Sequence, residues 1–131
     1  MLDTSIQQLL EKVIDSPIKL QICLVLYENH RLQGSATEFA NRLYRDIWST
    51  REALRQLTED GILIANCSHG GEPIYAYRPR PEYVDAIFRL AQSYNEPLER
   101  DKIQRALREI ASYAPYRRSA HSNGAFEFQI G

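Results

Sequence analysis

Four side chains near the middle of the chain have the types and spacing to recognise a ligand from one face of a helix: Trp48, Arg51, Arg55 and Thr58. A guanidinium can donate two parallel hydrogen bonds to a phosphate or to the acceptor edge of guanine, and a bidentate pair with a base contributes roughly 1–3 kcal/mol of discrimination. The same arginines could instead pair with Glu52 or Glu59 on a solvated face. Trp48 could stack on a sugar or phosphate, but its size favours a core or interface anchor.

This face belongs to a periodic run that predicts a helix over residues 47–60. The inward side of the helix carries Thr50, Ala53, Leu54 and Leu57. Asp46 could cap the helix, and Ser49 with Glu52 offers the spacing of a capping box three residues later. The sequence therefore predicts one face that packs and one that reaches outward, with the first turn open to two interpretations.

A second, shorter helix is predicted immediately before this one, over residues 36–43. Ser35 and Glu38 stand three apart, the spacing of a reciprocal capping box. The break at 44–46 separates the two helices by only a few residues. Two short helices joined so tightly predict a helix-turn-helix.

A hairpin follows the second of these helices. Gly61 supplies a left-handed stop, and residues 62–67 read as a β-branched-rich strand. The loop at 68–73 contains two consecutive glycines, and residues 74–77 return as the second strand. Helix, helix and hairpin in this order predict a winged helix-turn-helix, with the wing at 62–78.

Amphipathic helices are predicted before the helix-turn-helix. Apolar residues recur at helical spacing after the candidate cap Thr4, and Asp15 and Ser16 end that helix. Ser16 and Pro17 then read as a cap and first position of a largely apolar helix that runs to about Asn29.

Two more helices and a strand are predicted after the wing. One helix begins at Pro81 and runs to about Tyr94, with a stripe formed by Val84, Ile87, Phe88 and Ala91. Another follows Pro97, with a stripe formed by Ile103, Leu107, Ile110 and Ala114. Beyond Pro115 the apolar residues at 126–130 alternate with polar ones, which predicts that the tail docks as a strand.

These elements predict one domain, mainly α with a small β-hairpin wing. We expect N-terminal helices at 1–34, the helix-turn-helix and wing at 35–78, C-terminal helices at 79–114 and a tail at 115–131. A small winged head needs a further surface against which its flanking amphipathic helices can be buried. We therefore expect a homodimer formed through the N- and C-terminal helices.

The stretch Phe39-Ala-Asn-Arg-Leu43 through Ser49-Thr-Arg-Glu-Ala-Leu-Arg-Gln-Leu-Thr-Glu-Asp-Gly-Ile-Leu63 resembles, without a gap, the DNA-binding heads of winged-helix bacterial regulators of the MarR, PadR and GntR type. Those heads commonly carry a glycine at the turn and an apolar residue after it, where this chain has Tyr44 and Arg45. The turn must therefore differ, or Ile47 must fill that core position.

The resemblance implies a role for each outward residue of the head. Arg51 and Arg55 would contact base edges in the major groove, while Ser49 and Thr50 would lie near a phosphate and the 68–73 wing beside the adjacent groove. Further candidate contacts are Arg45, Thr58, His69 and Arg78. The implied function is a homodimeric, sequence-specific transcription regulator that binds double-stranded DNA.

Composition limits this interpretation. The 131 residues carry a net charge of −1, so any attraction to DNA must come from locally clustered basic groups. Near-neutral charge and eight tyrosines also fit a winged-helix module that binds a protein instead of DNA. A third possibility is that the tyrosine-rich helices line a pocket for a small-molecule effector, whose identity the sequence does not give.

Catalysis, cofactors and membrane insertion are not expected. The sequence has no phosphate-binding glycine loop, nucleophile elbow or clustered His, Cys and Asp, so we expect no enzyme and no cofactor. Cys67 and His69 with Glu72 fall short of the four ligands of a structural zinc site, and Cys23 and Cys67 are expected as free thiols that serve as small apolar residues. Short apolar stretches and the absence of a secretory signal predict a cytoplasmic protein.

Overall fold

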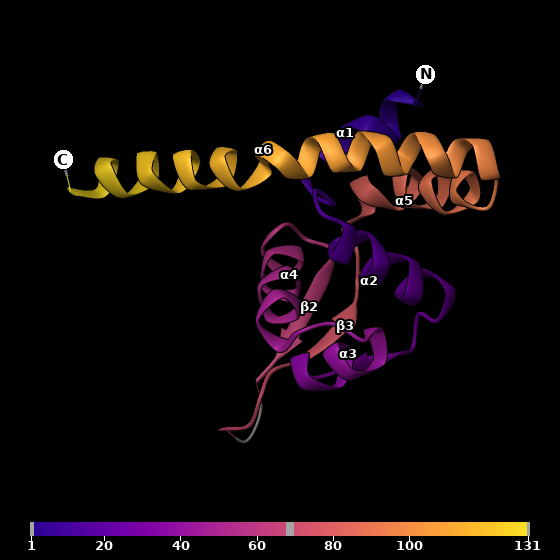
Figure 1. Cartoon of the computed structure of the whole chain (residues 1–131). Coiled ribbons are helices and arrows are strands. Elements are labelled where there is room, and N and C mark those ends of the chain that lie inside the picture. The colour runs from indigo at the N-terminus through magenta and orange to yellow at the C-terminus, as the bar shows by residue number, and fades with distance from the viewer. Residues whose placement is uncertain (1, 68–69, 131) are drawn as a thin grey trace.

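The computed structural model describes residues 2–67 and 70–130, with side chains described up to Arg118. A helical layer consists of α1 (Thr4–Lys12), α5 (Pro81–Tyr94) and α6 (Pro97–Ile130), and α6 runs along its length (Figure 1). Beneath it lies the head, which contains α2 (Pro17–Glu28), α3 (Ala36–Leu43), α4 (Ile47–Glu59) and a small sheet. The chain is thus mainly α with a hairpin wing, and the predicted winged helix-turn-helix is confirmed.

Side-chain caps begin the helices of the head and settle the open question about the start of α4. Ser35 and Glu38 form the predicted capping box of α3. The N-cap of α4 is Asp46, whose Oδ2 accepts from the Ser49 amide at 2.7 Å, so the later box starting at Ser49 does not form. The cap predicted at Thr4 is wrong by one residue, because Asp3 accepts from the first-turn amides of α1.

The turn between α3 and α4 keeps a glycine-like backbone without a glycine. Tyr44 adopts the left-handed conformation, with φ 55° and ψ 46°, and its side chain is 95% exposed. The Arg45 amide donates to the Ala40 carbonyl at 3.0 Å, which closes the end of α3. Ile47 packs against the core as a partly buried residue. The departure at Tyr44 therefore leaves the turn intact and places α4 as in a helix-turn-helix.

The sheet has one strand more than the sequence indicated. Strands β2 (Leu63–Asn66) and β3 (Ile74–Tyr77) form the predicted hairpin, and β1 (Gln33–Gly34) pairs with β3 on its other side. The two residues of β1 were predicted as part of a connection, because a segment this short has no periodicity to read. The third strand ties the wing to the chain that enters α3.

The helical layer buries most, but not all, of the predicted apolar stripes. Along α6 the whole stripe is buried: Ile103, Leu107, Ile110 and Ala114. On α5, Ile87 and Ala91 are buried together with Leu90, whereas Val84 and Phe88 remain 51% and 48% exposed. The stripe predicted on α5 is thus buried within the chain at Ile87 and Ala91, while Val84 and Phe88 stay on the surface.

The predicted tail strand is wrong, because α6 continues as a helix to Ile130 and its C-terminal half extends beyond the rest of the molecule (Figure 1). Pro115 lies inside the helix and costs one backbone hydrogen bond. Contacts just past the proline keep the helix in place: Arg117 donates to the Glu11 carbonyl, and Arg118 Nε donates to Asp15 Oδ2 at 2.7 Å. Extending an existing helix is cheaper than starting a new strand.

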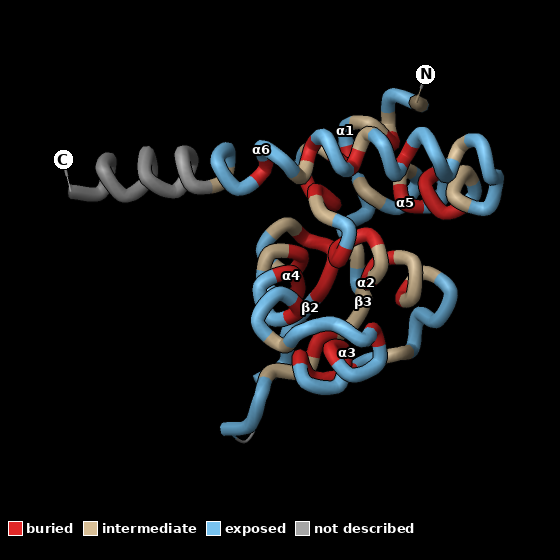
Figure 2. The backbone as a smooth tube through the Cα atoms, in the orientation of Figure 1, coloured by how far each residue is buried: buried red, intermediate tan, exposed pale blue. Residues whose placement is uncertain are grey.

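One apolar core joins the two layers. Buried residues fill the head and line the faces where α1, α5 and α6 meet (Figure 2). Fully buried side chains include Leu10 and Ile14 near the N-terminus, Leu54 and Leu57 on α4, and Ile103 on α6. Because α4 packs on the same core as the helical layer, its orientation is fixed relative to α6.

Candidate nucleic-acid interface

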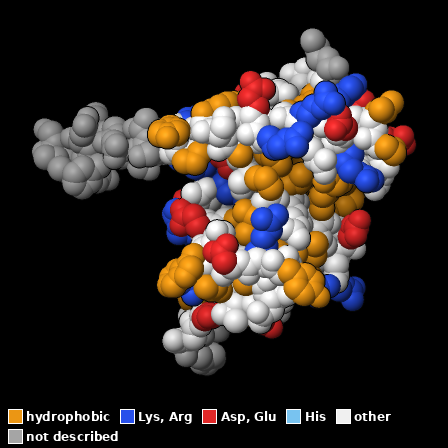
Figure 3. Space-filling model, in the orientation of Figure 1, with side chains coloured by type: hydrophobic (Ala, Val, Ile, Leu, Met, Phe, Trp, Pro, Cys, Tyr) orange, Lys and Arg blue, Asp and Glu red, His pale blue; other side chains and the backbone are white. Residues whose placement is uncertain are grey.

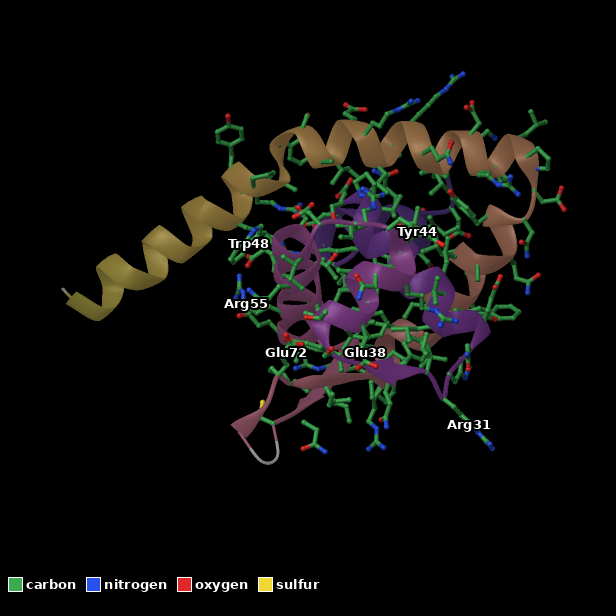
Figure 4. All side chains as sticks on the ribbon, turned by 60° about the horizontal axis from the view of Figure 1, so that its bottom comes forward. Arg31, Glu38, Tyr44, Trp48, Arg55 and Glu72 are labelled. Atoms are coloured by element: carbon green, nitrogen blue, oxygen red, sulfur yellow. The ribbon has the colours of Figure 1, made fainter. Side chains whose placement is uncertain are left out.

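The outward face of α4 carries the candidate readout residues. Trp48 and Arg55 both point away from the body of the head (Figure 4). Trp48 is 73% exposed, so of the two anchor roles expected for it the core role is excluded, and an interface role stays a prediction. The guanidinium of Arg51 lies over the Trp48 ring, 5.3 Å from its centroid, which is within the range of a cation–π contact. Ser49 is exposed in the first turn of the same helix.

Arg55 is held between two carboxylates. Its Nε donates to Glu52 Oε2 at 3.1 Å, Nη2 donates to Glu52 Oε1, and Nη1 donates to Glu59 Oε1. The hydrogen bonds that Arg55 donates to Glu52 raise the pKa of Arg55. Three of the five N–H groups are engaged, so one remains on each terminal nitrogen, enough for a two-acceptor edge such as that of guanine.

The two threonines of α4 are less available to a ligand than their place among the candidate contacts implied. Thr50 is fully buried, and its hydroxyl donates to the Asp46 carbonyl at 2.8 Å. Thr58 is half-buried, and its hydroxyl donates to the Leu54 carbonyl at 2.8 Å. Neither hydroxyl proton is free for a phosphate, and buried Thr50 is also out of reach of a ligand on the surface.

The remaining candidates lie away from the centre of this face. Arg45 Nε donates to Gln21 Oε1 at 2.9 Å, which draws its side chain toward α2. Arg78 follows the end of β3, and its amide donates to the Ile62 carbonyl at 3.0 Å, so it lies at the opposite end of the hairpin from the loop. His69 lies outside the described residues.

A hydrogen bond joins the hairpin loop to α3. Thr37 Oγ1 donates to Glu72 Oε1 at 2.8 Å across the gap between the first turn of α3 and the hairpin. This bond lowers the pKa of Glu72. In Figure 4, Glu72 lies beside the head on the same side as Glu38, close to where α3 begins. The wing is therefore held against α3, although a carboxylate here opposes a nearby phosphate.

Charge on the head is balanced and not basic. Residues 35–78 contain five arginines and six aspartates and glutamates. Basic and acidic side chains alternate over the face shown in Figure 3, which includes the outer side of α4. Attraction to a polyanion therefore depends on local groups, chiefly Arg51 and the free edge of Arg55, together with the N-terminal turn of α4.

A buried ionic cluster behind α4 was missed by the sequence analysis. Asp15 and Lys19, 2% and 3% exposed, form an ion pair at 2.6 Å. Arg118 of α6 bridges Asp15 at 2.7 Å and Asp60 at the end of α4 at 2.9 Å. Burial opposes ionisation of Asp15, but hydrogen bonds from Arg118 and Lys19 outweigh it and lower the pKa of Asp15. The spacing of Asp15 and Lys19 by four residues was the only signal available.

A cleft of about 810 Å³ opens beside this cluster, between α2, α4 and α6. Its wall includes the cluster itself and, toward solvent, Trp48, Ser49, Glu52 and Arg55. The cleft therefore joins the helical layer directly to the outward face of α4.

The described residues contain no disulfide and no cluster of metal-ligating side chains. Both cysteines are free, as expected, but Cys67 is exposed and only Cys23 is buried. Burial raises the pKa of the Cys23 thiol to about 12. Within the described residues, no three His, Cys, Asp or Glu side chains cluster as metal ligands would, and no helix has the length and apolar character needed to span a bilayer.

The order of helix, left-handed turn, helix and hairpin defines the chain as a winged helix-turn-helix protein. Solved structures similar to it include the following two. Transcriptional regulator Tm0710 from Thermotoga maritima shares 12% identity over 92% of this chain and 85% of its own, with a TM-score of 0.49. A cysteine-to-serine mutant of ZitR from Lactococcus lactis shares 13% over 87% and 74%, with a TM-score of 0.44. No family model and no curated protein sequence matches the chain.

Proposed function

We propose that this protein is a DNA-binding transcription regulator that inserts α4 into the major groove. The observation that carries the proposal is the outward face of α4, where Arg51 and Arg55 are exposed on a helix that packs firmly on its other side. A helix fits the major groove, and its exposed guanidinium groups can reach the acceptors of guanine.

Each exposed residue of the face has a separate role in the proposal. Arg55 contacts a base edge with its two remaining N–H groups, and Arg51 contacts a base or phosphate after leaving Trp48. Ser49 and the N-terminal amides of α4 contact a backbone phosphate. The wing lies beside an adjacent groove, while Arg45 and Arg78 offer peripheral phosphate contacts.

We also propose that the protein acts as a homodimer through α5 and α6. Five of the eight exposed large apolar side chains among the described residues lie on these two helices: Val84, Phe88, Leu98, Tyr113 and Tyr116. The apolar side of α1 is already buried within its own chain, so the N-terminal helix expected in the interface is less suited to it. A two-fold dimer would present two copies of α4 to a palindromic site.

Phe88→Asp tests the dimer. We expect the variant to be monomeric by light scattering at concentrations where the wild type is dimeric, because a charge would be buried in the interface. Tyr44→Asp is the matched control, since Tyr44 is an exposed aromatic residue outside α5 and α6. A wild-type monomer, or a Phe88→Asp dimer, contradicts the proposal.

A second function is favoured by the charge balance of the same face. Arg55 is paired with two glutamates, and Trp48 is exposed next to Arg51, a combination common at protein interfaces. The protein could therefore use α4 to bind a protein partner instead of DNA. The domain limits, a cytoplasmic location and an effector remain predictions under either function.

Salt dependence separates the two functions. DNA binding through phosphates must weaken as salt rises, because counterions are released. We expect salt-dependent binding to random duplex DNA, and tighter binding to duplexes selected from a random pool. Arg51→Ala with Arg55→Ala should abolish the preference for selected duplexes. Arg105→Ala is the control, since Arg105 pairs with Asp101 on an exposed face of α6. Salt-independent binding, or an unaffected double variant, refutes the proposal.

A further inference from the structure

A continuous set of polar contacts leads from α6 through the base of the head to Arg55. At its inner end, the buried Asp15 carboxylate accepts from Lys19 Nζ at 2.6 Å and from Arg118 Nε at 2.7 Å. Arg118 also donates to Asp60 Oδ2 at 2.9 Å. Lys19 thus has a fixed position, set by a carboxylate that α6 also contacts.

Gln56 links the buried cluster to Glu52 on the exposed face of α4. Its Oε1 accepts from Lys19 Nζ, and its Nε2 donates to Glu52 Oε1 at 2.8 Å. The charges fix the orientation of this amide, because a flipped amide would turn its NH₂ group toward an ammonium and its oxygen toward a carboxylate. Gln56 therefore holds Glu52 from behind.

Glu52 in turn presents both carboxylate oxygens to Arg55. A side chain as long as arginine on an exposed helix face samples several rotamers, and ordering it on binding weakens affinity. Exposed ion pairs such as those of Arg55 with Glu52 and Glu59 order little by themselves. Here Glu52 is itself held by Gln56, so Arg55 is restrained before any ligand arrives.

We infer that Lys19 and Gln56 are positioning residues for Arg55, and that their contacts hold its guanidinium in the orientation in which it reads a base. Arg118 extends this restraint to α6, so the helical layer and the readout residue are connected by direct contacts. The restraint concerns Arg55 itself, whereas its use in reading a base rests on the proposed function.

The first test needs no DNA. Gln56→Met removes both contacts of the amide at a partly exposed position, and melting curves check that the variant folds. We expect ¹⁵N relaxation of the Arg55 Nε–H group to show faster, larger motion than in the wild type. The control is Gln104→Met, which removes a hydrogen bond to the Tyr94 hydroxyl between α5 and α6. Unchanged motion of Arg55 in Gln56→Met overturns the inference.

The second test measures coupling on duplexes selected by the wild type. Gln56→Met should weaken binding by roughly two- to tenfold, the cost of ordering one long side chain. In an Arg55→Ala background the same substitution should leave DNA affinity unchanged. If Gln56 only stabilised the fold, the substitution would weaken binding in both backgrounds. Equal losses in both backgrounds overturn the inference. If the wild type binds no DNA, the proposed function fails, and the relaxation test alone decides whether Arg55 is positioned.

Discussion

Replacing Lys19 with methionine should destabilise the protein strongly, although lysine is ordinarily a surface residue. Its side chain is 3% exposed, and its ammonium donates to Asp15 and to Gln56. Methionine retains most of the buried methylene length but removes the charge. Asp15, 2% exposed, then keeps only its contacts with Arg117 and Arg118.

The loss of stability in Lys19→Met depends on Asp15, the charged partner that stays buried. Breaking a buried ion pair by removing one member costs about 3–5 kcal/mol, because the other charge stays buried and uncompensated. Arg118 still neutralises Asp15, so we expect the lower end, about 3 kcal/mol. For a domain of this size that loss lowers the melting temperature by roughly 10 °C. Replacing both Asp15 and Lys19 should cost less than the sum of the single changes.

Chemical unfolding of the wild type, the two single variants and the double variant measures these quantities. Lys102→Met is the control, because Lys102 pairs with Glu99 at 3.2 Å on an exposed face of α6 and should change stability little. A loss below about 1 kcal/mol for Lys19→Met, or additive losses in the double variant, would refute the buried-cluster reasoning.

Three further predictions concern acid, thiols and the turn. The pKa of Asp15 is lowered by its hydrogen bonds with Arg118 and Lys19 against the opposing effect of burial, so this stabilisation is present above the unfolded pKa of 3.8 and disappears as pH falls through the folded one. In Asp15→Asn the free energy of unfolding should therefore fall less steeply below about pH 4 than in the wild type. An unchanged pH dependence would count against this role of Asp15. Native protein should react with a thiol reagent at exposed Cys67, while buried Cys23, whose pKa is raised to about 12, should react only after unfolding. Equal labelling rates would contradict that assignment. Tyr44→Gly should stabilise the protein by about 1 kcal/mol through relief of a left-handed backbone, whereas Gly61→Ala, at φ 93°, should destabilise it by at least that amount. Melting curves measure both changes. If the two substitutions shifted the melting temperature in the same direction, backbone strain would not govern these turns.

Local signals allowed the head to be predicted from the sequence. The capping box of α3, the proline that begins α2 and the glycine after α4 each act within a few residues, so their patterns are visible without the fold. The inward and outward sides of α4 followed from helical spacing alone. The pairing of Arg55 with Glu52 and Glu59 was one of the two alternatives considered, and both of its contacts form.

Contacts between distant segments could not be predicted in this way. Arg118 meets Asp15 across 103 positions, and no local pattern indicates that this aspartate and Lys19 are buried. The alternation near the C-terminus suggested a strand, but contacts of Arg117 and Arg118 carry α6 past Pro115. The exposure of Val84 and Phe88 likewise depends on which helices cover α5.

The most direct test of DNA recognition by α4 is the salt dependence of binding to a selected duplex, measured for the wild type and for Arg51→Ala with Arg55→Ala. We predict a negative slope of log affinity against log salt for the wild type, and for the double variant an affinity no greater than that for random duplex. A slope near zero, or selected-duplex affinity that the double substitution leaves intact, would contradict the account.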